Sequence, residues 1–205
     1  PQSAGGRTIT TTEPKFIPQE AVELKLAGEV TIRVRLVDCV GFMVEGAAGH
    51  LEDGAERLVK TPWYDHEIPF TQAAELGTRK VITDHSTIGV VVTTDGSFSD
   101  LPQETYLDAE NQAISELKKL HKPFLVLVNS SHPSSRTARE AAERIEKQHS
   151  VTAMPVNCAQ LSEEDIRQIM EQILYEFPVT EVEFYVPKWV EMLSREHKIK
   201  QDLFE

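Results

Sequence analysis

The sequence predicts an α/β fold with a mostly parallel sheet, and three observations lead to that class. Apolar runs rich in β-branched residues alternate with longer stretches of helical periodicity. No apolar run approaches the ~18 residues that a membrane-spanning helix needs, so a soluble chain without a membrane span is expected. The 205 residues hold 21 Lys and Arg against 33 Asp and Glu, and the resulting net charge of −12 argues against a nucleic-acid-binding protein.

The first two predicted strands form an antiparallel hairpin. Apolar side chains alternate over residues 21–26 and 30–38, and Ala27-Gly28-Glu29 provides a short turn. A loop-rich stretch over residues 41–69 follows. Three strand-helix units then require a parallel sheet, and the expected elements are helix 70–84, strand 87–93, helix 103–121, strand 124–129, helix 135–148, strand 151–157 and helix 162–175.

Local signals set the helix boundaries. Pro123 should end the second helix, because proline lacks an N–H and biases Lys122 away from helical backbone angles. Ser162 is the expected N-cap of the last helix, with Glu164 and Asp165 at the positive end of the helix dipole. The apolar stripe of this helix should pack on the sheet, and its members are Ile166, Ile169, Met170, Ile173 and Leu174.

The pattern changes after Pro178. Residues 180–186 alternate like a strand, and residues 187–203 have the periodicity of an amphipathic helix. We therefore expect one domain over 1–178 and the start of a following middle region over 179–205. The chain begins with Pro1 and has no leader, so we expect a piece of a longer protein. Cys39 and Cys158 end apolar runs and are expected to be buried thiols in the reducing cytoplasm.

Two motifs near the hairpin predict phosphate and Mg²⁺ chemistry. The second strand ends in Asp38-Cys-Val-Gly41. In nucleoside triphosphatases an Asp in this place holds Mg²⁺ through water, and a Gly lets its N–H approach the γ-phosphate. Thr11 and Thr12, on the loop before the hairpin, can offer a hydroxyl to Mg²⁺ and an amide to the γ-phosphate. Each motif alone is also compatible with an ordinary turn or a β-prone loop.

Two further motifs predict a nucleotide-base site. Asn129-Ser-Ser-His132 ends a strand where GTPases carry Asn-Lys-x-Asp. His132 replaces the Asp that would bind guanine, which favours adenine or an absence of base selection. Asn157, Cys158 and Ala159 occupy the loop that lines the base before the final helix. Asn129 and these three residues are therefore the candidate nucleotide-binding residues.

The order of the four motifs is that of a Ras-like P-loop NTPase from its second motif onward, a three-layer α/β sandwich with a mostly parallel sheet. No Gly-x-x-x-x-Gly-Lys-Ser/Thr occurs, so we expect the first strand and the P-loop to precede Pro1. That strand lies in the middle of the sheet in this topology. Its absence should leave an open slot between the hairpin and the later strands, and this chain alone should be inactive.

Along essentially its whole length the chain resembles the stage IV sporulation protein A family, the spore-coat morphogenetic ATPases of endospore-forming Firmicutes. The strings that carry the resemblance include Thr11-Thr-Glu-Pro-Lys-Phe16, Arg35-Leu-Val-Asp-Cys-Val-Gly41, Ala74-Glu-Leu-Gly-Thr-Arg-Lys-Val81 and Leu174-Tyr-Glu-Phe-Pro-Val179. The resemblance implies Mg²⁺-dependent ATP hydrolysis that drives self-assembly into a polymer, the basement layer of the coat around the forespore.

The same resemblance implies roles for individual residues. Thr11 and Thr12 match the sensor threonines, Asp38 matches the acidic residue beside Mg²⁺, and Gly41 completes its motif. Phe42 stands where many GTPases place a water-orienting Gln, so Thr11 or Thr12 is the candidate for positioning the attacking water.

The resemblance also implies a place and partners. The implied place is the mother-cell cytoplasm at the outer surface of the forespore. The implied partners are other copies of the chain, spore coat and cortex morphogenetic proteins, and a small amphipathic membrane peptide bound by regions outside this chain. The alternative hypothesis is a nucleotide-independent scaffold or assembly module on a degenerate GTPase-like fold.

Overall fold

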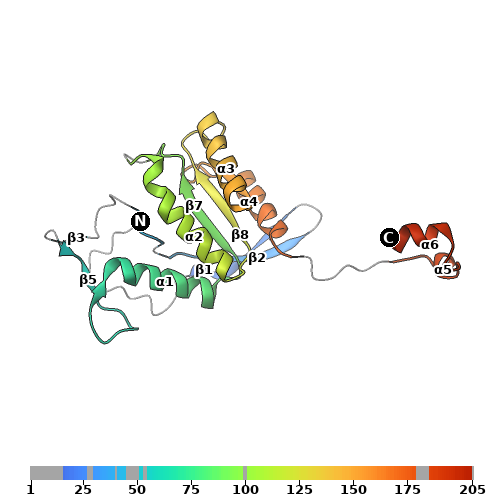
Figure 1. Cartoon of the computed structure of the whole chain (residues 1–205), viewed down its shortest axis with the longest axis horizontal. Helices are drawn as coiled ribbons and strands as arrows, with labels where there is room; N and C mark the ends of the chain where they lie inside the picture. Colours follow the sequence, from blue (N-terminus) through green and yellow to red (C-terminus); the bar gives the residue numbers. More distant parts are fainter. Residues whose placement is uncertain are drawn as a thin grey trace.

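A parallel three-stranded sheet in the order β7-β8-β9 lies at the centre of the computed structural model (Figure 1). The structure describes residues 16–26, 30–39, 41–44, 51–52, 55–98, 101–178 and 185–204. The strands are β7 (Gly89–Thr94), β8 (Phe124–Asn129) and β9 (Ala153–Val156). Helices cover both faces of this sheet, which confirms the predicted α/β class and its layered arrangement.

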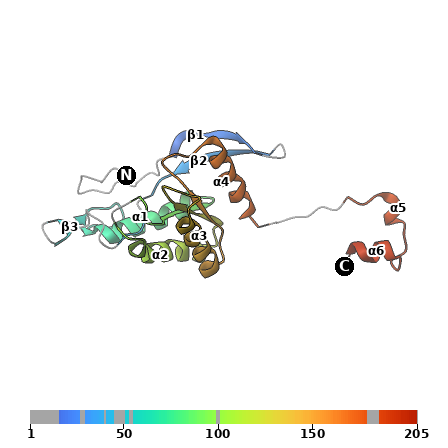
Figure 2. The same cartoon turned by 90° about the horizontal axis from the view of Figure 1, so that it is seen from above.

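The two faces of the sheet are covered by different helices. The helices α2 (Leu107–Lys119) and α3 (Arg136–His149) lie on one side, and α4 (Glu163–Tyr175) lies on the other (Figure 2). Val126 of β8 belongs to a buried cluster with Ile114 of α2 and Ile145 of α3. Its neighbour Leu127 packs in a second cluster with Ile169 of α4. Because β8 is buried on both faces, its sequence is a continuous apolar run rather than an alternating one.

The predicted cap at Ser162 is present, and the structure adds a second cap at Ser135. The Ser135 hydroxyl accepts a hydrogen bond from Ala138 N (3.2 Å) and starts α3. At the start of α4, the Ser162 hydroxyl accepts from Asp165 N (3.1 Å), and the Asp165 carboxylate accepts from Ser162 N (2.8 Å). This reciprocal pair is a capping box, which satisfies backbone donors that the helix itself leaves free.

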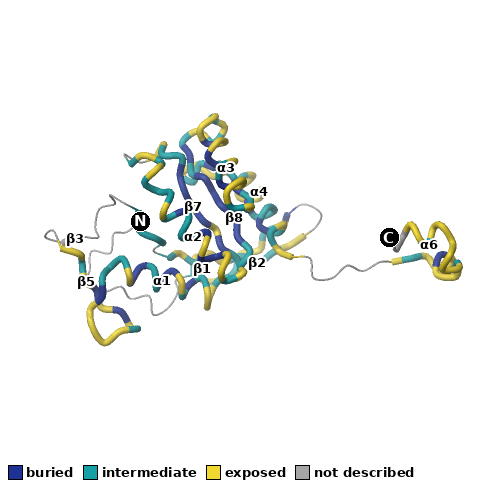
Figure 3. The backbone as a smooth tube through the Cα atoms, in the orientation of Figure 1, coloured by how far each residue is buried: buried dark blue, intermediate teal, exposed yellow. Residues whose placement is uncertain are grey.

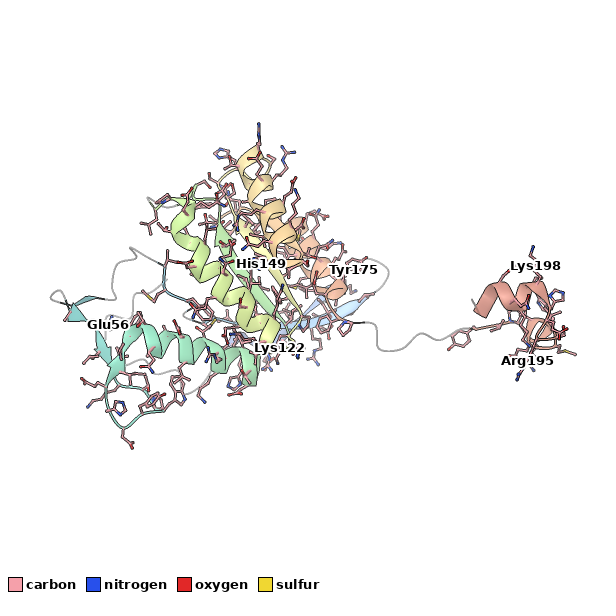
Figure 4. All side chains as sticks on the ribbon, viewed as in Figure 1. Glu56, Lys122, His149, Tyr175, Arg195 and Lys198 are labelled. Carbon is pink, nitrogen blue, oxygen red and sulfur yellow. The ribbon has the colours of Figure 1, made fainter. Side chains whose placement is uncertain are left out.

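The second helix ends before Pro123, as predicted, but it starts differently. A 3-10 turn, η2 (Gln103–Tyr106), takes the place of its first turn, and the α-helical part begins at Leu107. The Lys122 ammonium, labelled in Figure 4, donates a hydrogen bond to the Ser86 carbonyl (2.7 Å). This contact joins the end of α2 to the end of α1 (Phe70–His85), a helix that starts at the expected residue.

The predicted hairpin is also present, as β1 (Phe16–Lys25) paired antiparallel with β2 (Thr31–Val37). Strand β1 begins at Phe16, before the predicted start at residue 21, and its register shifts between Ile17 and Val22. The turn residues 27–29 lie outside the described residues. Two small antiparallel pairs follow: β3 (Leu51–Glu52) with β4 (Ala55–Glu56), and β5 (Leu58–Val59) with β6 (Ile68–Pro69).

The prediction of one helix over residues 187–203 is wrong. The structure has two short helices there, α5 (Lys188–Glu191) and α6 (Lys198–Phe204). The Lys200 ammonium donates hydrogen bonds to the carbonyls of Glu191 (2.8 Å) and Leu193 (3.0 Å), so these groups are satisfied without a continuing helix. Of the predicted strand 180–186, residues 180–184 lie outside the described part, and Tyr185 and Val186 are in no strand.

Burial is uneven across the sheet. Figure 3 shows buried residues along β8 and on the helix faces turned toward it. In β7, by contrast, Val90 and Val92 are 41% and 59% exposed, although they pair with the buried Leu125 and Leu127 of β8. Helix α4 therefore covers only part of its face of the sheet. Among the described helices, none is both long and apolar enough to span a bilayer.

Candidate active site

The Asp-x-x-Gly motif lies where β2 ends. Asp38 directly follows the last residue of β2, and its side chain is exposed. Within the described ranges the Asp38 carboxylate has no hydrogen bond or ion pair. An exposed carboxylate is a suitable ligand for a hard divalent cation, directly or through water.

Gly41 is needed for its backbone conformation. Its φ is +83°, in the left-handed region that residues with a Cβ rarely adopt. A Cβ built at Gly41 would meet no atom within 4 Å. A side chain at this position would therefore be disfavoured by backbone strain and not by crowding.

A threonine of α1 contacts this glycine. The Thr78 hydroxyl accepts a hydrogen bond from Gly41 N (2.9 Å) and also lies within hydrogen-bond distance of the Gly41 carbonyl (3.2 Å), to which it donates. Cys39 is half-buried beside this pair. Burial raises the pKa of the Cys39 thiol, and hydrogen bonds with Thr78 and Gly41 oppose that rise.

Thr11 and Thr12, the predicted sensor residues, lie outside the described residues. Their proximity to Asp38 therefore stays a prediction. Phe42 lies within the described part and is half-buried against the same cavity as Gly41. A phenyl ring has no group that could orient a water molecule, so Phe42 cannot replace the water-orienting Gln.

A cavity of about 420 Å³ separates the end of β2 from β7. Asp38 and Gly41 line it, together with Val91 and Thr93 of β7 and Glu110 of α2. The two strands belong to different sheets, and no described strand pairs with the edge of β7 that β8 leaves free. The predicted open slot between the hairpin and the later strands is thus found among the described residues.

The four candidate nucleotide-binding residues, Asn129, Asn157, Cys158 and Ala159, come together where β8 and β9 end. The Asn129 side-chain oxygen accepts a hydrogen bond from Cys158 N (2.9 Å), and the Asn157 side-chain oxygen accepts one from Ala159 N (3.1 Å). The Asn157 amide also donates to the Ser131 carbonyl (3.5 Å), a long hydrogen bond. In the part of the chain with described coordinates, the Asn129 Nδ2 group has no acceptor, so it is available to a ligand.

Sequence reasoning missed Asp95, which joins the ends of β7 and β8. Its carboxylate accepts hydrogen bonds from the Ser130 hydroxyl (2.6 Å) and from the hydroxyl and N–H of Ser97 (2.6 and 3.0 Å). Partial burial acts to raise the pKa of Asp95, but these hydrogen bonds outweigh it and hold the pKa below its ordinary value. An Asp-Gly pair directly after a strand was the available sequence signal.

Ser130 stands at the lysine position of the Asn-Lys-x-Asp motif. Its hydroxyl, fully buried, donates to Asp95 and accepts from His132 N (3.1 Å). Ser130 therefore supports the loop from inside and does not reach toward a ligand. The exposed His132 ring contacts the Ser131 hydroxyl through Nδ1 (3.0 Å).

Comparison with known proteins fixes the family. A sequence model described as stage IV sporulation protein A, ATPase domain, matches residues 1–178. The chain belongs to the stage IV sporulation protein A family. It is 48% identical over 203 residues to stage IV sporulation protein A of Clostridioides difficile, covering 99% of this chain and 41% of that protein. For the Bacillus anthracis and Bacillus subtilis proteins the identities are 42% and 41% over 205 residues, covering all of this chain and 42% of each relative.

Membership places the chain among sporulation proteins that contain an ATPase domain. The chain spans about two-fifths of the length of the curated relatives that it matches.

The described residues of this family member fit part of a nucleotide site. Asp38 supplies one carboxylate of the kind that Mg²⁺ binds, and no group of three or more His, Cys, Asp or Glu side chains gathers as a metal cluster within the ranges described. Mg²⁺ usually takes one or two protein carboxylates, several waters and substrate phosphates, so a single carboxylate is compatible with it. The available Asn129 amide suits a nitrogen acceptor on a base.

Proposed function

We propose that this chain is part of an ATPase whose Mg²⁺-dependent hydrolysis of ATP drives self-assembly of a spore-coat basement-layer polymer around the forespore. The observation that carries this proposal is the exposed Asp38 carboxylate, which has no partner among the described residues, beside Gly41 in a chain whose family is described by an ATPase domain. A P-loop from residues outside this sequence is required, because the sequence has no such motif.

In the proposed site, Asp38 holds the water shell of Mg²⁺. The Gly41 N–H donates to the γ-phosphate, and Thr11 and Thr12 supply a further Mg²⁺ ligand and position the attacking water. The cation, when bound, neutralises charge that develops on the phosphate oxygens.

Base recognition in this proposal rests on Asn129. Its amide, which has no acceptor among the described residues, would donate to a ring nitrogen, while its oxygen fixes the loop of Asn157, Cys158 and Ala159 through Cys158 N. No carboxylate occupies the His132 position to accept from the N1 and N2 hydrogens of guanine. This absence of an acceptor supports adenine over guanine.

We further propose the mother-cell cytoplasm at the forespore surface as the site of action. The proposed partners are other copies of the protein, coat and cortex morphogenetic proteins, and a small amphipathic membrane peptide. A net charge of −12 opposes direct binding to an anionic bilayer, so recruitment to the forespore requires such a peptide, bound outside this chain.

The test measures ATP and GTP hydrolysis together with light scattering, on the parent protein with its native upstream residues. Wild type is compared with Asp38→Ala in the same Mg²⁺ buffer, and circular dichroism checks that the variant folds. Glu164→Ala, an exposed acidic residue on α4, is the matched control for loss of one carboxylate.

Turnover of ATP that disappears in Asp38→Ala but not in Glu164→Ala, together with loss of assembly, supports the coupled ATPase. Unchanged scattering with no turnover in any of the three proteins contradicts it. That second outcome favours the nucleotide-independent scaffold.

A further inference from the structure

The Thr78 side chain makes an unusual contact for a threonine inside a helix. Such hydroxyls commonly bond to the carbonyl four residues earlier, as Thr83 does with Arg79 O (2.8 Å) on the same helix. Thr78 instead turns its hydroxyl to Gly41, 37 positions away in the sequence, and meets both its N–H (2.9 Å) and its carbonyl (3.2 Å).

The two partners of this contact differ in how firmly they are held. Thr78 is 2% exposed and belongs to the buried face of α1, together with Ala74, Gly77 and Val81. Gly41 has open space where its Cβ would be, and it lines the cavity beside Asp38. The glycine therefore has room to move relative to a fixed hydroxyl.

The contact uses the atom that the proposed reaction needs. A backbone N–H has a single hydrogen, so Gly41 N–H cannot fully serve the Thr78 hydroxyl and a γ-phosphate oxygen at once. ADP has no γ-phosphate and makes no such demand. The competition is therefore specific for the triphosphate.

We propose that Thr78 is a positioning residue that holds the Gly41 N–H away from the nucleotide until a γ-phosphate replaces its hydroxyl. This inference rests on the proposed function and adds a residue that sets the preference between ATP and ADP. Release of the Gly41 N–H also removes a direct tie between the Asp38 loop and α1. The loss of this hydrogen bond is how the presence of the γ-phosphate would reach the helix.

The experiment measures binding of ADP and of the non-hydrolysable analogue AMP-PNP, with Mg²⁺, by titration calorimetry on the full-length parent protein. Thr78→Val removes the hydroxyl and keeps the shape of the side chain. Thr78→Ser keeps the hydroxyl. Thr83→Val removes a hydroxyl from the same helix that bonds only within the helix, and is the matched control.

Thr78→Val is expected to tighten AMP-PNP binding by about three- to tenfold, because the Gly41 N–H no longer has to leave the Thr78 hydroxyl, and a net hydrogen bond corresponds to a change of this size. ADP binding should stay unchanged. Thr78→Ser and Thr83→Val should both keep the wild-type ratio of the two affinities. If Thr78→Val does not fold, Thr78→Ala makes the same comparison with less crowding.

A second readout needs no nucleotide. Amide hydrogen exchange of the peptide that contains Gly41 should be faster in Thr78→Val than in wild type, because its N–H has lost an acceptor. Unchanged exchange, or equal shifts in ADP and AMP-PNP affinity, would overturn the role of Thr78. If wild type binds neither nucleotide, the proposed function fails and this inference falls with it. If wild type binds both and the ratio is unaffected, only this inference fails.

Discussion

Arg144 of α3 holds the buried carboxylate of Glu110 of α2. Its Nη1 lies 2.8 Å from Oε1, at an angle that gives no regular hydrogen bond, so the attraction at this oxygen is Coulombic. Its Nη2 donates to Oε2 (3.1 Å), which also accepts from the Thr93 hydroxyl (2.8 Å). The Glu110 side chain is 1% exposed. Thr93 of β7 and Glu110 of α2 both line the cavity beside Asp38. The contacts of Glu110 with Thr93 and Arg144 therefore hold β7, α2 and α3 together at the wall of the candidate site.

Arg144→Ala should lower the free energy of unfolding by about 2–3 kcal/mol, because it leaves a buried carboxylate without its cation. The matched control is Lys147→Ala on the same helix, whose ion pair with Glu143 is exposed on both sides. Exposed pairs of this kind contribute about 0.5 kcal/mol or less. Urea unfolding followed by circular dichroism measures both variants, and equal losses in the two would show that burial of Glu110 does not matter.

The fold could be predicted where local signals agree with burial. Strand β8 was predicted to the residue, since Pro123 precedes a continuous apolar run and polar residues follow it. The N-cap Ser162 marked the start of α4, and the predicted start of α3 at residue 135 is one residue before its first helical residue, Arg136. The tail was predicted poorly, because its helical periodicity contains no glycine and no proline after Pro187, and Lys200 satisfies carbonyls at the interruption through a long-range contact.

The candidate site was predictable only in part. Asp38, Gly41 and the Asn129 loop occupy strand ends that a short motif marks. Thr78 carries no such signal, because its partner lies 37 positions away and a threonine in mid-helix has several ordinary uses. Long-range side-chain pairing of this kind follows from the packing of α1 and cannot be read from a local pattern.

Asp95→Asn should lower the melting temperature at neutral pH, and the difference from wild type should shrink in acid. The folded state holds the pKa of Asp95 below its unfolded value of about 3.9, so folding favours the ionised form. The resulting stabilisation is complete above the unfolded pKa and is lost as the pH falls through the folded pKa. Melting curves between pH 3 and pH 7 measure this difference.

Asp84→Asn is the control for the Asp95 experiment, since Asp84 is an exposed carboxyl near the end of α1. A difference for Asp95→Asn that stays constant down to pH 3 would mean that the hydrogen bonds from Ser130 and Ser97 do not favour the ionised carboxylate.

Val92→Thr tests whether residues upstream of this sequence cover the exposed face of β7 in the parent protein. Val92 is 59% exposed in the described residues, so the substitution should change the stability of this 205-residue chain by less than about 0.5 kcal/mol. We expect upstream residues to cover this face in the parent protein, where the same change should cost about 1–2 kcal/mol, since it buries a hydroxyl in an apolar contact. Val126→Thr, at a fully buried position of β8, should be costly in both chains. Equal small effects of Val92→Thr in the two chains would contradict the predicted filling of the slot.

His132→Asp should shift nucleotide preference from ATP toward GTP in the parent protein. The exposed His132 ring follows the Asn129 loop, and a carboxylate there would accept hydrogen bonds from the N1 and N2 positions of guanine, whereas adenine offers no such pair of donors. The ratio of kcat/KM for GTP over ATP should rise on the order of tenfold, the value of one or two added hydrogen bonds to a charged acceptor. His132→Asn, which adds no charge, should raise the ratio less, and steady-state hydrolysis of both nucleotides measures it. A ratio that the carboxylate leaves unchanged would mean that residue 132 does not face the base, and that adenine preference is set elsewhere in the Asn157–Ala159 loop.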